Sequence, residues 1–197
     1  MAEEKYILMV MDMQNDFCSE SGVFARHGYD PGPIGPIIPR IGNLMNFCRE
    51  RHIPIVASQL TVLTDLDGGA MGLGHLRDLR PFLVEEGFRA GTWGQETIDD
   101  LPQPDYKVRK WGYSAMHQTE LEKVLRSLGG TTLVFTGIAT NGVVEGTARD
   151  AVAREFDVIT LSDCVMGYNI ALHEASLKNL GNVGQLMTSE EVMKMIG

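Results

Sequence analysis

The chain has 197 residues, of which 44% are hydrophobic and 22% are charged, and these ordinary globular values exclude disorder, collagen and disulfide scaffolds. This length suits one compact domain, which we expect to span residues 1–197. A net charge of -9 would repel a polyanion, so we expect no nucleic-acid partner.

Short apolar segments of strand length alternate with helical patterns along the chain. Strands are expected at residues 6–11, 54–59, 107–110, 131–137, 157–163 and 184–187. Helices are expected at 37–52, 119–129, 143–156 and 171–181. Thr188 stands three positions before Glu191, the spacing of a capping box, and predicts a short helix at the C-terminal end. The alternation predicts an α/β fold with a parallel sheet covered on both faces.

Two segments, 19–35 and 61–91, resist assignment to helix or strand. The first contains six Gly or Pro residues, and the second contains the glycines at 68–74. These glycines lack the Lys-Ser/Thr that follows a phosphate-binding loop, so we interpret the stretch as a flexible loop over a functional site.

The cysteines and the apolar runs indicate where the protein works. Cys18, Cys48 and Cys164 form no CxxC pair, and an odd number of thiols is typical of a reducing compartment. The apolar run at residues 6–11 ends at Asp12, too early for a signal peptide. No stretch approaches the about 20 apolar residues that span a bilayer. We therefore expect a cytoplasmic protein with no membrane partner.

Three places at the ends of predicted strands carry candidate functional groups, because ligands of open parallel sheets bind there. Asp12 follows the first strand, where apolar neighbours penalise its charged form and a nearby cation would favour it, a balance that suits proton transfer. Its alternative role is a helix or turn cap, as for Asp16. Lys110 ends the strand at 107–110, although a lone lysine is normally a solvated charge. The turn within 136–151 offers backbone N–H groups to a developing oxyanion.

Four motifs carry a resemblance to a known family. They are MDMQNDF (11–17), AGTWGQETIDDL (90–101), KWGYSAM (110–116) and GIATNGVVEGTARDA (137–151). In order and spacing they resemble the isochorismatase-like hydrolase superfamily. The resemblance implies a three-layer α/β/α fold with a six-stranded, mostly parallel sheet, a homo-oligomer (dimer or tetramer), a small-molecule substrate, and catalytic roles for Asp12 and Lys110.

The turn after the fourth strand departs from the family pattern. Val143 occupies the position of the family's nucleophilic cysteine, and its side chain cannot form a thioester. The resemblance implies that Ala139, Thr140, Gly142 and Val143 surround the oxyanion, with a cis peptide bond at Ala139-Thr140. Isochorismatases proper have glycine at the cysteine position and use acid catalysis on a vinyl ether. In this chain the nearest glycine, Gly142, comes one position early.

We expect neither metal nor cofactor. The nicotinamidase branch of the superfamily binds metal through an Asp and paired histidines after the second strand, and this chain has no histidine there until His75. His173, on a predicted helix, is interpreted as structural.

Aromatic and basic residues near the candidate groups predict the walls of a pocket. Trp93, Trp111 and Tyr113 could line a pocket for a planar or cyclic substrate, or be core residues. Arg89 could bind a substrate carboxylate through two parallel hydrogen bonds, or be a surface charge.

Three functions remain open at this point. The first is a metal-free hydrolase of a small cyclic or carboxylic-acid-containing molecule that uses Asp12 and Lys110. The second is an amide or ureide hydrolase that uses activated water. The third is a non-catalytic protein that binds a small molecule.

Overall fold

One parallel sheet forms the centre of the computed structural model, which describes residues 4–197; residues 1–3 of the expected domain lie outside the described residues. The strand order is β5-β2-β1-β6-β7-β8, and every neighbouring pair is parallel. The strands are β1 (Tyr6–Met11), β2 (Ile55–Leu60), β5 (Tyr106–Lys110), β6 (Thr132–Ile138), β7 (Asp157–Met166) and β8 (Gln185–Met187). The predicted α/β fold with six strands is therefore confirmed.

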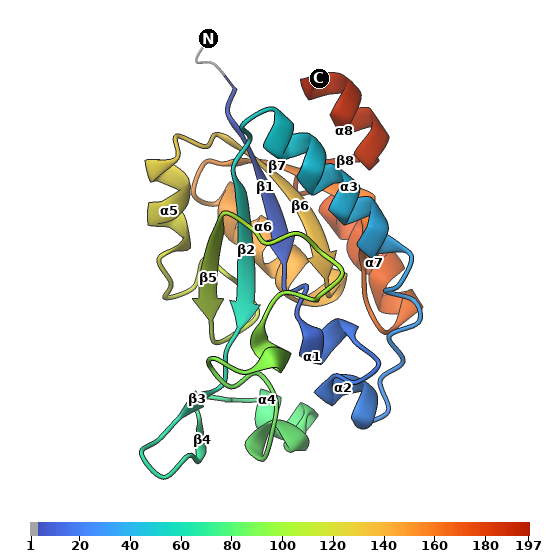
Figure 1. Ribbon diagram of the computed structural model, residues 1–197. Helices are drawn as coiled ribbons and strands as arrows, with labels where there is room; N and C mark the ends of the chain where they lie inside the picture. The colour runs from blue at the N-terminus through green and yellow to red at the C-terminus, as the bar shows by residue number, and fades with distance from the viewer. Residues whose placement is uncertain (1–3) are drawn as a thin grey trace.

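Helices cover both faces of the sheet (Figure 1). Alternate residues of β1 point to opposite sides, so that Leu8 and Val10 pack in one apolar cluster and Ile7 and Met9 in another. The first cluster includes side chains of α3 (Ile37–Glu50) and α8 (Ser189–Ile196). The second includes side chains of α5 (Leu121–Ser127), α6 (Glu145–Val152) and α7 (Ile170–Leu180). Burial of each large apolar side chain contributes about 1.5–3 kcal/mol, so both layers stabilise the sheet.

Two helix starts can be compared with those predicted from the sequence. The predicted capping box is present, because the Thr188 hydroxyl accepts the Glu191 N–H at 3.3 Å and the Glu191 carboxylate accepts the Thr188 N–H at 2.7 Å. The helix expected at 143–156 is instead divided into a π-helical turn, η3 (Thr140–Val144), and α6. The turn after β6 is thus wound more widely than an α-helix, and α6 begins two residues later than expected.

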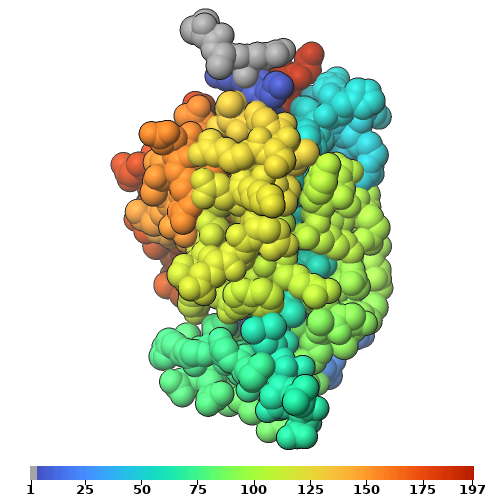
Figure 2. Space-filling view, turned by 90° about the vertical axis from the view of Figure 1, so that its left-hand side faces the viewer, coloured from blue at the N-terminus to red at the C-terminus, as the bar shows by residue number. Residues whose placement is uncertain are grey.

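The two unassigned segments hold short elements that gather at the carboxyl ends of the strands (Figure 1). Segment 19–35 contains α2 (Val23–Arg26), which follows α1 (Asn15–Cys18). Segment 61–91 contains the antiparallel pair β3 (Leu63–Thr64) and β4 (Ala70–Met71), then α4 (Leu76–Leu79) and η1 (Pro81–Val84); η2 (Trp93–Gln95) follows. In Figure 2 segment 61–91 forms the end of the molecule opposite the N-terminus. Among residues 4–197, no helix combines the length and apolar composition needed to span a bilayer.

Candidate active site

The strand order reverses between β1 and β6, because β2 and β5 lie on one side of β1 and the later strands lie on the other. In an open parallel sheet the ligand crevice lies at such a point, at the carboxyl ends of the strands. Asp12 follows β1 with φ of 49°, a left-handed conformation that Asp tolerates better than most residues. Beside it, Gly137 has φ of +102°, and a Cβ there would lie 2.1 Å from the Met11 carbonyl oxygen. Glycine thus permits β6 to approach the end of β1 closely.

Asp12 and Lys110 form a buried ion pair. The Lys110 Nζ lies 2.7 Å from Asp12 Oδ2, and the two side chains are 3% and 4% exposed. The second carboxylate oxygen accepts a 2.6 Å hydrogen bond from the Ser58 hydroxyl. Lys110 also donates to the Gly112 carbonyl at 2.8 Å. The strand register explains this meeting, because β2 lies between β1 and β5 and pairs Ser58 with Met11 and Leu60 with Lys110.

Opposing influences act on the Asp12 carboxyl group. Burial raises its pKa and is the largest effect, whereas the Lys110 charge and the hydrogen bonds from Lys110 and Ser58 lower it. The resulting pKa is raised above the usual range for Asp. The carboxyl group therefore keeps its proton to a higher pH than a solvent-exposed Asp, and it is suited to acid and base chemistry.

The turn after β6 differs by one residue from the expected geometry. The cis peptide bond joins Ile138 and Ala139, so the expectation of Ala139-Thr140 is wrong. The strand extends one residue beyond its predicted end, to Ile138, and the turn starts from there. Ala139 accepts the Gly142 N–H at 2.9 Å. Within residues 4–197 the N–H of Ala139 itself donates to no protein group.

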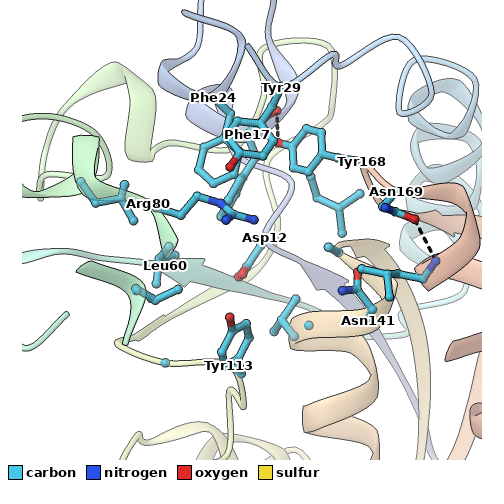
Figure 3. Close-up of a pocket in the computed structure, with 18 of the residues that line it drawn as sticks. Asp12, Phe17, Phe24, Tyr29, Leu60, Arg80, Tyr113, Asn141, Tyr168 and Asn169 are labelled. Carbon is cyan, nitrogen blue, oxygen red and sulfur yellow. Dashed lines mark hydrogen bonds between the residues drawn. The ribbon is translucent and has the colours of Figure 1, made fainter. Parts of the chain in front are cut away.

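A pocket of about 410 Å³ opens above these groups, a volume typical of small-molecule sites (Figure 3). The predicted residues that line it are Asp12, Lys110, Tyr113, Ala139, Gly142 and Val143. Thr140 is not part of the lining, because its buried hydroxyl lies 2.8 Å from His173 Nδ1. His173 thus supports the turn, as expected of a structural histidine.

Three predicted wall residues lie outside the lining. Trp93 is 46% exposed and donates from Nε1 to Asp99 at 2.9 Å. Trp111 donates to the Gln118 carbonyl at 3.4 Å. Arg89 donates to the carbonyls of residues 83, 84 and 87 at 2.8–3.1 Å, so its guanidinium holds the loop together instead of facing the pocket.

The aromatic wall of the pocket comes from residues that sequence reasoning missed. It consists of Phe17, Phe24, Tyr29 and Tyr168, with Arg80 beside them. Phe24 and Tyr168 stack with ring centroids 5.3 Å apart, and the Tyr168 hydroxyl donates to the Phe17 carbonyl at 2.6 Å. The prediction of a loop over the site within segment 61–91 is only partly right. Residues in 76–83 contribute to the lining, but the glycines at 68–74 do not. Ser58 was also missed, although a hydroxyl near the end of an apolar strand was its signal.

The three thiols lie apart from this pocket. Cys18, Cys48 and Cys164 are buried, and none belongs to its lining. Burial raises the pKa of Cys18, and it raises the pKa of Cys48 and of Cys164 to about 12, so the nucleophilic thiolate form is disfavoured at neutral pH. In the part of the chain that the structure describes, no three His, Cys, Asp or Glu side chains are grouped to hold a metal ion.

The isochorismatase domain model matches residues 6–191 of this chain. The chain belongs to the isochorismatase family. As a member of this hydrolase family, it is 36% identical over 187 residues to the ureidoacrylate amidohydrolase RutB of Methylorubrum extorquens, covering 88% of this chain and 75% of the relative.

Solved structures of the isochorismatase family share the fold over nearly the whole chain. The isochorismatase-like hydrolase from Alkaliphilus metalliredigens has a TM-score of 0.81 at 30% identity, covering 98% of this chain and 99% of that one. The cysteine hydrolase from Pseudomonas syringae pv. phaseolicola 1448A has a TM-score of 0.86 at 28% identity, covering 98% and 92%. The chain therefore has the architecture of family hydrolases.

Proposed function

We propose that this isochorismatase-family chain hydrolyses a small cyclic or carboxylic-acid-containing molecule, with Asp12 as general acid and base and Lys110 as its partner. The observation that carries this proposal is the buried Asp12–Lys110 pair, at 2.7 Å, on the floor of the pocket. We further propose that the reaction needs no metal, cofactor or covalent cysteine intermediate. Val143 lines the pocket at the family's cysteine position, and the three thiols are elsewhere.

The first reaction that fits is acid-catalysed hydrolysis of an enol ether. Protonated Asp12 transfers its proton to the terminal vinyl carbon, which leaves an oxocarbenium ion. Water adds to the cationic carbon and returns a proton to Asp12, and the hemiketal collapses to a ketone and an alcohol. The raised pKa of Asp12 supports this route, because the step begins with the neutral carboxyl group.

The second candidate is hydrolysis of an amide or ureide by activated water, which the identity with RutB favours. Here ionised Asp12 takes a proton from water as the water oxygen attacks the carbonyl carbon. The free N–H of Ala139 donates to the developing oxyanion, and Asp12 then gives the proton to the leaving nitrogen as the C–N bond breaks. The Lys110 and Ser58 hydrogen bonds support the ionised carboxylate that this route requires.

A substrate panel with a pH profile tests the proposal. We expect NMR to detect hydrolysis of at least one small enol ether, ureido acid or primary amide by the parent protein, and at least about 100-fold slower turnover by Asp12→Asn. Asp100→Asn, which alters an exposed carboxylate, should keep parent activity. Enol ether hydrolysis should decline as pH rises through the pKa of Asp12, whereas amide hydrolysis should decline as pH falls through it.

Other outcomes would contradict the catalytic assignment. Equal turnover by Asp12→Asn would exclude Asp12 as the acid or base. Saturable binding across the panel without any product would favour the third function, a non-catalytic binding protein. A single domain over 1–197, a cytoplasmic location and a dimer or tetramer remain predictions.

A further inference from the structure

Arg80 is a pocket-lining cation that has no acidic partner within residues 4–197. None of the ion pairs within residues 4–197 includes it, and its guanidinium donates only to the neighbouring Leu79 carbonyl, at 2.8 Å through one terminal nitrogen. Lys110, the other lining cation, is already paired with Asp12. The pocket therefore carries one uncompensated positive charge in a chain whose net charge is -9.

Aromatic rings fix the position of this guanidinium. Its central carbon lies 4.7 Å from the ring centroid of Tyr29 and 5.9 Å from that of Phe24. Stacking on rings leaves the N–H edge of an arginine available to a ligand. Figure 3 shows the guanidinium pointing into the pocket, in this view between the aromatic rings and Asp12.

The apolar rings and the charge together select a kind of ligand. Phe24, Tyr29 and Tyr168 offer apolar surface, and the Tyr168 hydroxyl is occupied by the Phe17 carbonyl. A flat, unsaturated body matches such a surface, and a carboxylate matches the planar fork of an arginine. Arg89, the earlier candidate for this role, is committed to loop carbonyls.

We propose that Arg80 binds the carboxylate of the substrate while a flat, unsaturated or aromatic body lies against Phe24, Tyr29 and Tyr168. The substrate class is then a small planar monocarboxylate, oriented so that its hydrolysable bond faces Asp12 and Lys110. This inference deepens the proposed function and rests on it for the position of the reacting bond. Arg80 is assigned as a specificity-determining residue.

Calorimetry with ligands that cannot be hydrolysed tests the binding role separately from catalysis. The probes are trans-cinnamate, its neutral analogue cinnamyl alcohol, and acetate, which has the carboxylate without the ring. The parent protein should bind cinnamate at least about 10-fold more tightly than either comparison ligand. Arg80→Gln should lose the preference for cinnamate over the alcohol. The control Arg77→Gln, at an exposed position on α4, the short helix that precedes Arg80, should keep it.

Each contrary result overturns the assignment. It fails if the parent protein binds none of the probes, if it binds cinnamate and the alcohol equally, or if Arg80→Gln keeps the preference. If Arg80→Gln does not fold, the crystal structure of the parent protein with cinnamate decides: a carboxylate on Arg80 supports the inference, and one on Lys110 overturns it. With an active substrate, Arg80→Gln should raise KM and leave kcat nearly unchanged, whereas failure of the proposed function appears as turnover by Asp12→Asn.

Discussion

Asp12, Ser58 and Lys110 lie at the ends of three neighbouring strands, whereas Phe24, Tyr29 and Arg80 come from two segments with little regular structure. Backbone hydrogen bonds between the strands set their register. The sheet itself therefore positions Asp12, Ser58 and Lys110, which form the floor of the pocket. The wall depends on loop conformations that few regular hydrogen bonds constrain. The comparison indicates that the reacting groups and the groups that select the substrate are held by separate parts of the molecule.

Asp16 joins the two segments that supply Phe24, Tyr29 and Arg80. Its carboxylate accepts the Val23 N–H at 3.1 Å and the Phe88 N–H at 2.6 Å. Gly94 leaves room for this carboxylate, since a Cβ there would lie 2.2 Å from Asp16 Oδ2. The buried Asp16 side chain thus fixes the two segments relative to each other, as strand pairing fixes the residues of the floor.

Breaking the ion pair of the floor should give the largest effect on stability. Lys110→Met leaves the buried Asp12 carboxylate without its partner, and we expect the free energy of unfolding to fall by about 3–5 kcal/mol. Chemical denaturation at neutral pH measures this loss. The double variant Asp12→Asn/Lys110→Met, which removes both charges, should recover most of it while remaining inactive. Equal stability of the parent and Lys110→Met would show that solvent reaches the pair.

Asp16→Asn should loosen the wall and spare the floor. Asn offers one acceptor oxygen in place of two, and its amide hydrogens would face a backbone N–H, so we expect a loss of about 2–3 kcal/mol. Hydrogen exchange should accelerate in 19–35 and 80–91 and stay slow in β1 and β6. Asp30→Asn, at an exposed site that accepts only the Gly32 N–H, is the control. Faster exchange in β1 would contradict the separation of the two regions.

The floor could be predicted from sequence because the pattern of residues shows where the first and third predicted strands end. Asp12 follows an apolar run and Lys110 ends the strand predicted at 107–110, and a parallel sheet brings such strand ends together. The predicted strand ends at Asp163, three residues before the end of β7. In the structure the Asp163 carboxylate accepts the Ser189 N–H at 2.8 Å and hydroxyl at 2.6 Å, and the strand continues to Met166.

The wall could not be predicted in the same way. Arg80 and Arg89 lie in one segment without clear periodicity, and only the folded loop shows which guanidinium meets carbonyls and which meets the pocket. Trp93 looked like a pocket residue because of its motif, but its indole points to Asp99. Long-range hydrogen bonds such as those of Asp16 decide these orientations, and they leave no local sequence pattern.

Val143→Cys should place a thiol at the floor of the pocket with little effect on stability. Val143 is 3% exposed and lines the pocket, and a volume-conserving change should cost less than about 1.5 kcal/mol. The nearby positive charge of Lys110 and the start of α6 favour a thiolate there. We expect mass spectrometry to detect a covalent adduct with an activated amide or aldehyde, while the parent protein forms none. If Val143→Cys stays unmodified under conditions that label a free-thiol control, this position does not face substrate.

The smallest expected effect concerns His173, which supports the turn between the two regions. Burial lowers the pKa of His173 below its usual 6.5, so the unfolded chain takes up a proton first as pH falls. The free energy of unfolding should therefore decline as pH drops through about 6.5. The contribution of His173 to this decline should end once the pH is below its folded-state pKa. In the tautomer with its proton on Nε2, Nδ1 accepts the Thr140 hydroxyl, and protonation of Nδ1 removes this acceptor. His173→Gln should remove this part of the pH dependence between pH 7 and 5, whereas His117→Gln, at an exposed position, should keep it. Denaturation curves that remain parallel for the parent and His173→Gln across this range would show that the imidazole stays accessible to solvent protons in the folded state.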